Sequence, residues 1–122
     1  MPAAKPQKKR MNLTKKADAL FGKIVRAPGC CIVCGGTEVI QAAHGFSRRY
    51  YPVRWDERNC FPMCRADHMR YTHNPLLWDE WLHDQWGDDL YDELRQLALS
   101  GSRPDFDELI PALEARLAEV SA

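Results

Sequence analysis

Two short clusters of cysteines constrain this chain more than any other feature of its sequence. Cys31 and Cys34 are two residues apart and are followed by Gly-Gly, which allows the tight turn that aims two sulfurs at one ion. Cys60 and Cys64 form the second cluster further along the chain. In a reducing compartment such clusters favour a metal over disulfides. The spacing predicts a structural zinc ion joining the two stretches, in preference to free thiols or a thioredoxin-like redox pair.

The fourth zinc ligand is less constrained than the thiols. The second stretch offers several donors: Cys60, Cys64, Asp67, His68 and His73. Cys64 and His68 are four residues apart, which on a helix places both donors on the same face. The preferred ligands are therefore Cys31, Cys34, Cys64 and His68, with Asp67 as the second choice for the fourth position and Cys60 as the third.

Hydrophobic periodicity predicts an α+β fold, with a small zinc-bound core flanked by helices at both ends of the chain. Apolar residues from Leu13 to Val25 recur at helical spacing, with Asn12 or Thr14 as candidate N-cap. We expect strands over 38–44 and within 45–63, and helices over 67–72, 76–86, 90–99 and 106–120, the last of them capped by Asp105. The expected organisation is a disordered basic arm over 1–11, a zinc-bound domain over 12–100, and a linker with an acidic amphipathic helix over 101–122.

Charge is unevenly distributed, although the net charge is zero. Residues 1–26 carry eight basic side chains and one acidic one, giving +7, whereas residues 78–122 carry three and twelve, giving −9. The basic first half favours a polyanionic partner such as DNA. No apolar run is long enough to span a membrane, and no signal peptide is evident. We therefore expect a cytoplasmic protein without membrane contacts.

Histidine and asparagine residues near the cysteines form a candidate reactive set. Hydrolysis of a phosphodiester needs a base to activate water, a divalent cation to stabilise developing charge, and a group that orients the base. His44 is the candidate base because a neutral imidazole is available near pH 7. A side-chain or backbone carbonyl can orient it, with Asn59 as the candidate, and His73 is the candidate ligand of a catalytic Mg²⁺ or Mn²⁺ if His68 binds the zinc.

Basic and aromatic residues alternate in the stretch that follows His44. Arginine forks bind phosphate groups bidentately, and tyrosine rings can stack on exposed bases. The candidate nucleic-acid-binding residues are Arg48, Arg49, Arg54 and Arg58. The alternative is a basic loop that pairs with the acidic C-terminal segment.

Several of these residues together resemble the phage recombination proteins of the NinG (Rap) type, which belong to the HNH, or His-Me finger, endonucleases. The resemblance covers about residues 14–98. Its most specific parts are Gln41-Ala-Ala-His44 and Arg54-Trp-Asp-Glu-Arg-Asn59. Further parts are Lys16-Ala-Asp-Ala-Leu-Phe21, Cys31-Ile-Val-Cys34-Gly35, Arg48-Arg49, Cys64, Asn74 and Trp86-Gly87.

The resemblance implies a ββα-metal core and hydrolysis of DNA phosphodiesters, with a preference for branched recombination intermediates. By position, it makes His44 the general base and Asn59 the central Asn of the motif. His68 stands at the third motif position, and Asp67 replaces the fourth zinc cysteine. A homodimer is an attractive arrangement for an enzyme that cuts junctions, by analogy alone.

Two departures from the family leave alternatives open. With Asp67 at the cysteine position, His68 could serve either the zinc or the catalytic ion. Ala43 precedes the candidate base, where many HNH enzymes carry an Asp that binds the catalytic ion. The alternatives to a nuclease are a non-catalytic zinc module that binds DNA or RNA, and a protein-interaction module that uses the stripe of Trp78, Trp81 and Trp86.

Overall fold

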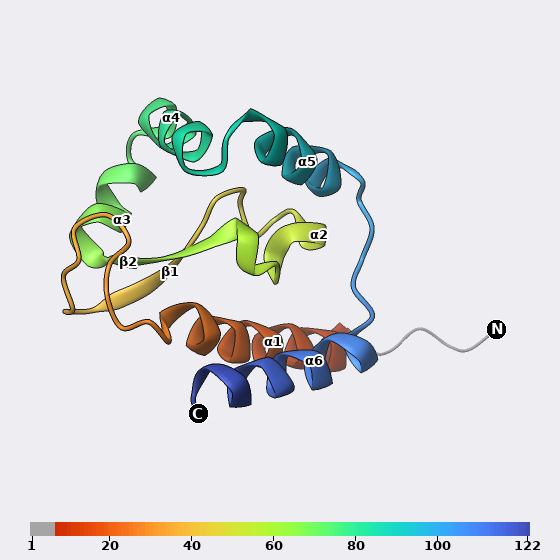
Figure 1. Cartoon of the computed structure of the whole chain (residues 1–122). Helices are drawn as coiled ribbons and strands as arrows, with labels where there is room; N and C mark the ends of the chain where they lie inside the picture. The colour runs from red at the N-terminus through yellow and green to blue at the C-terminus, as the bar shows by residue number, and fades with distance from the viewer. Residues whose placement is uncertain (1–6) are drawn as a thin grey trace.

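The computed structural model describes residues 7–122 and shows an α+β fold, as the sequence predicted (Figure 1). A two-stranded antiparallel sheet is surrounded by six α-helices. In chain order the elements are α1 (Gln7–Arg26), β1 (Ile40–His44), α2 (Tyr51–Arg54), a 3₁₀ turn (Glu57–Asn59), β2 (Cys60–Cys64), α3 (Arg65–Thr72), α4 (Pro75–Trp86), α5 (Asp88–Leu99) and α6 (Phe106–Val120). No helix within residues 7–122 is long and apolar enough to cross a membrane.

Helix α1 begins at Gln7, within the stretch that the sequence assigned to a disordered arm. The expected caps Asn12 and Thr14 are therefore wrong, since both lie inside the helix. Residues 7–10 lack apolar periodicity, but Gln, Lys and Arg are good helix formers and can extend a helix that packing has already fixed. The rest of the predicted arm, residues 1–6, lies outside the described residues.

The antiparallel pairing of β1 with β2 determines which candidate site residues lie side by side. Ile40 pairs with Cys64 at one end, and His44 pairs with Cys60 at the other. Helix α3 follows β2 without a loop, because the side chain of Cys64 accepts a hydrogen bond from the Asp67 backbone and so acts as its N-cap. The hairpin thus brings a histidine to one end and a cysteine knuckle to the other.

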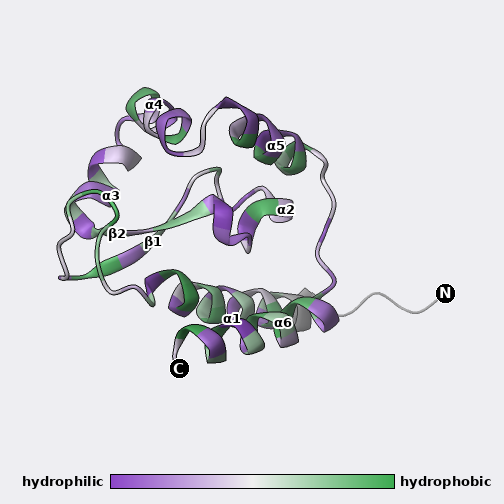
Figure 2. Ribbon diagram, viewed as in Figure 1, coloured by the Kyte–Doolittle hydropathy of each residue, from purple (hydrophilic) through white to green (hydrophobic). Residues whose placement is uncertain are grey.

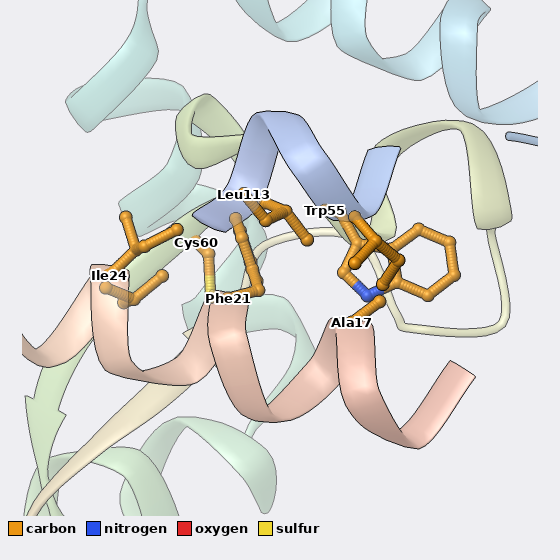
Figure 3. Close-up of a cluster of buried hydrophobic side chains, with 8 residues drawn as sticks. Ala17, Phe21, Ile24, Trp55, Cys60 and Leu113 are labelled. Atoms are coloured by element: carbon orange, nitrogen blue, oxygen red, sulfur yellow. The ribbon is translucent and has the colours of Figure 1, made fainter. Parts of the chain in front are cut away.

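Helices α1 and α6 pack together and cover one face of the hairpin. Their apolar residues form a buried cluster with Trp55 and Cys60, and Figure 3 shows Phe21 of α1 and Leu113 of α6 within it. Asp105 caps α6 as the sequence predicted, by accepting a hydrogen bond from the Asp107 backbone. The acidic helix α6 therefore shares a hydrophobic core with the basic helix α1.

Helices α3, α4 and α5 cover the rest of the hairpin and its loop. Trp78, Trp81 and Trp86 surround Phe61 of β2, and the indole N–H groups of Trp78 and Trp86 donate to backbone carbonyls. This packing uses much of the tryptophan stripe within the core. Helix α5 directs its hydrophobic residues toward α2, as Figure 2 shows, and its buried Leu94 clusters with Val53 of α2.

Candidate metal centre and histidine groove

The first cysteine knuckle is a tight turn between α1 and β1. The Cys31 backbone donates to Gly36 O (2.8 Å), and the Gly35 backbone donates to Cys31 O (2.9 Å). Gly35 has φ of +76°, a conformation that favours glycine. This turn orients both sulfurs toward the second knuckle.

Four side chains converge at this point: Cys31, Cys34, Cys64 and Asp67. Their candidate ligand atoms all lie within 4.8 Å of one another. The sulfurs of Cys34 and Cys64 are 3.8 Å apart, and the Asp67 carboxylate lies 3.2 Å from the Cys64 sulfur. Two sulfurs bound to a tetrahedral zinc at about 2.3 Å are separated by about 3.8 Å. The chain therefore forms a Cys₃Asp group that is consistent with a structural zinc site.

Asp67, the second choice from the sequence, occupies the fourth position of this group, and the preference for His68 was wrong. The four-residue spacing from Cys64 assumed that both residues lie within the helix, but Cys64 is the N-cap and has extended backbone angles. Neighbouring helical residues point about 100° apart, so His68 faces away from the cysteines when Asp67 faces them. The third choice, Cys60, lies in the core beside α1, where burial raises the pKa of its thiol to about 12.

His44, the candidate base, is oriented by a backbone carbonyl. Its Nε2 lies 2.8 Å from Arg54 O, and because a carbonyl can only accept, Nε2 carries the hydrogen and Nδ1 keeps a lone pair. The imidazole also packs 5.9 Å from the Phe21 ring, centroid to centroid. Burial lowers the pKa of His44, so the neutral form predominates at pH 7.

Asn59 shapes the loop around His44 and does not bind the imidazole itself. Its side chain is fully buried, accepts from the Phe46 backbone N–H (2.7 Å), and donates to Phe46 O (2.9 Å) and Val53 O (3.1 Å). Of the two kinds of group expected to hold the imidazole, a side chain such as Asn59 or a backbone carbonyl, the structure shows the second, the carbonyl of Arg54. Asn59 acts indirectly, by fixing the loop that carries this carbonyl.

His68 shares a groove with His44. The groove has a volume of about 830 Å³ and is lined by α1, β1, α3 and the start of α4. Both histidines also line a smaller hollow of about 50 Å³. His68 Nδ1 lies 2.8 Å from Gln41 Oε1, which leaves Nε2 free to bind a cation. Gln41 was not among the site residues assigned from the sequence, although it lies three residues before His44.

His73 does not line this groove, contrary to the expectation that it would hold the catalytic ion. It is the C-cap of α3 and is exposed, one turn beyond the residues that face β1. The structure therefore brings His44 together with His68, rather than with His73.

The arginines differ in how far their charges are available. The guanidinium of Arg54 binds the Asp18 carboxylate (2.6 and 3.1 Å), and that of Arg58 binds Asp56 (2.8 and 3.1 Å), so both of these candidate phosphate ligands already have a carboxylate partner. Arg48 is 61% exposed and lines the groove. Arg49 is exposed and lies over the Tyr50 ring, outside the groove.

Arg26 also lines the groove and was not singled out in the sequence. The signal was available, because Asp18, Gly22 and Arg26 recur at four-residue spacing and so share one face of α1.

No family model matches the chain, and no curated protein or solved structure matches it either.

Proposed function

We propose that the chain is a metal-dependent endonuclease of the HNH, or His-Me finger, type that hydrolyses phosphodiester bonds in DNA. The observation that carries this proposal is the pairing of His44 and His68 on one groove, with each imidazole oriented by a hydrogen bond through one nitrogen. Each ring thereby presents a lone pair on its other nitrogen. Two such imidazoles, one as base and one as metal ligand, meet the needs of phosphodiester hydrolysis.

His44 is the general base in this proposal. The Arg54 carbonyl holds the hydrogen on Nε2 and fixes the ring, so Nδ1 can take a proton from water. Burial favours the neutral imidazole, which is the form that can accept this proton. The Phe21 ring on the α1 side limits rotation of the imidazole.

His68 is the proposed ligand of Mg²⁺ or Mn²⁺, through Nε2. The ion would stabilise negative charge on the phosphate and the leaving oxygen. Across residues 7–122, the Cys₃Asp group is the only set of three or more clustered potential ligands, so His68 would share the ion with substrate oxygens and water. Ala43 is buried and supplies no carboxylate beside the base.

The Cys₃Asp group supports this geometry from outside the groove. It joins the loop before β1 to the first turn of α3, and Asp67 is adjacent to His68. A zinc ion there would fix α3 relative to β1 and thereby hold His68 opposite His44. The proposed zinc therefore has a structural role, and it does not contact the substrate.

The charge of the groove favours an anionic substrate. Arg26 and Arg48 line it, and its one acidic lining residue, Asp18, is already bound to Arg54. A DNA backbone would meet two cationic side chains and one neutralised carboxylate. The family resemblance extends the proposal to branched DNA, and a comparison of cleavage of a four-way junction with that of linear duplexes tests this extension.

The decisive experiment is a plasmid-nicking assay on the zinc-loaded protein with added Mg²⁺ or Mn²⁺. We expect His44→Ala and His68→Ala each to lower cleavage by at least about 100-fold, the scale of acid–base catalysis. His73→Ala is the matched control and should cleave normally. Nicking by His44→Ala at the parental rate, with normal folding, would remove the proposed base.

A non-catalytic zinc module that binds nucleic acid is the second candidate. The buried Ala43 favours it, because no carboxylate adjoins His44 to help retain a catalytic ion. Tight DNA binding without cleavage in Mg²⁺, Mn²⁺, Ca²⁺ or Co²⁺ would support this module over the nuclease.

A further inference from the structure

Helix α1 has a residue without a side chain, Gly22, in the wall of the groove that His44 also lines. Gly22 follows Phe21, whose ring contacts His44, and both Gly22 and Arg26 line the groove. A Cβ at position 22 would lie 2.7 Å from Nη1 of Arg26, and its three nearest atoms would all belong to that guanidinium. Gly22 is buried, and the Arg26 guanidinium lies across its backbone, in space that the side chain of any other residue would fill.

This guanidinium is not committed elsewhere. Arg26 has no acidic partner within the described part of the chain, whereas Arg54 and Arg58 are bound to aspartates. One helical turn before Gly22, Asp18 lies 4.0 Å from the Arg48 guanidinium. Gly22 thus lies between two arginines, in the groove that the candidate base also lines.

We propose that Gly22, Arg26 and Arg48 form a subsite for the DNA phosphate group that lies nearest His44. The inference rests on the proposed nuclease function for the identity of the substrate, but it concerns binding and can be tested without cleavage. A guanidinium offers two parallel N–H donors to a phosphate, and its position over Gly22 directs them into the groove. Glycine at position 22 is what permits this position.

Two substitutions separate the position of the guanidinium from its charge. Arg26→Ala removes the charge, whereas Gly22→Ala keeps it and displaces only the flexible end of Arg26. Alanine is also a better helix former than glycine, so Gly22→Ala should raise Tm while it weakens binding. Loss of binding together with a higher Tm could not come from unfolding.

The test measures binding of a labelled DNA duplex by fluorescence anisotropy, in a His44→Ala background and without added Mg²⁺, over a range of salt concentrations. Arg26→Ala should weaken binding about tenfold and lower the slope of log K against log salt by about 0.9, the value for one lost phosphate contact. Gly22→Ala should weaken binding with a smaller change in slope. Lys16→Ala is the control, since Lys16 is exposed on the same helix but does not line the groove.

Equal losses for Arg26→Ala and Lys16→Ala would overturn the subsite, because they would reflect only the net charge of α1. Parental binding by Gly22→Ala would overturn it as well. If the parent chain fails to cut DNA with any ion but these binding differences appear, the proposed nuclease activity fails and the subsite stands. If the parent cuts and Arg26→Ala binds normally, only the subsite fails.

Discussion

The Cys₃Asp group and the histidine groove use adjacent residues of α3, yet they are built differently. Asp67 joins three cysteines through two local turns, whereas His68 meets His44 only because α1, the hairpin and the loop pack around one groove. Sequence spacing therefore predicted that the three thiols would cluster, as they do, but it grouped the neighbouring histidine with them, whereas the structure places His68 in the groove. A local motif fixes the relative positions of its residues by itself, whereas the residues of a groove are brought together by contacts between distant segments.

The largest expected effect is a difference between substitutions at the adjacent positions Asp67 and His68. Asp67→Ala should lower zinc affinity by at least tenfold and lower Tm markedly, since metal binding contributes directly to folding. His68→Ala should retain the zinc and the Tm while it loses cleavage. Zinc content by mass spectrometry and thermal melts measure both, and loss of zinc in His68→Ala would contradict the division.

Asn59→Ala tests how strongly the groove depends on its loop. The substitution removes three hydrogen bonds and leaves Phe46 and Val53 backbone groups without partners in a buried site. We expect a loss of about 2–4 kcal/mol in the free energy of unfolding, measured by urea denaturation, with zinc still bound in the folded state. Asn74→Ala is the control, because its exposed side chain makes one hydrogen bond, to Arg70 O.

Asp18→Asn tests the link between α1 and the carbonyl that orients His44. Asp18 accepts from the side chains of Arg54 and Trp55, so the substitution weakens an interaction that is largely buried on the arginine side. We expect a loss of about 1–2 kcal/mol in unfolding free energy, together with a lower cleavage rate. Glu57→Gln, which weakens the exposed pair with Arg116, should have a much smaller effect on stability.

The pH dependence should be the smallest effect. Burial lowers the pKa of His44 from its usual value of about 6.5; the hydrogen bond to the Arg54 carbonyl and the charge of Asp18 oppose this shift, while the charges of Arg48 and Arg54 add to it. The folded state therefore favours the neutral ring. Its contribution to stability is complete above about pH 6.5 and is lost as the pH falls through the lower folded value.

Cleavage should follow the same titration, because only neutral His44 can accept a proton. We expect the acidic limb of the rate profile to have its midpoint below pH 6.5, and NMR titration of His44 to give the same value. His68 lines the same groove, so the titration should be repeated in His68→Ala to assign the signal. A midpoint above 7 would contradict the buried, neutral imidazole.

Much of the fold could be predicted because its signals are local. The strand ending at His44, the helix that stops before Gly87 and the Asp105 cap each depend on neighbouring residues alone. The start of α1 could not be read in this way, because residues 7–10 have helix-forming side chains but no apolar stripe. Apolar periodicity marks the part of a helix that packs against a core, and it does not indicate how far the helix extends beyond that part.

The site was only partly predictable for a related reason. His44 was identified from its position in a motif, but the partner of its Nε2 is a main-chain carbonyl ten residues away, which no side-chain pattern can indicate. The pairing of Arg54 with Asp18 likewise joins segments 36 residues apart. A count of basic residues in the loop could not show which of them were already neutralised.

The dual role of Cys64 has a consequence for regulation. Its sulfur belongs to the Cys₃Asp group and also caps α3, whose second turn carries His68. If the group holds zinc, removal of the ion would loosen the start of that helix and displace His68, which lies outside the ligand group. If zinc fills this group, as we propose, chelation should therefore disturb the histidine groove without any ligand entering it.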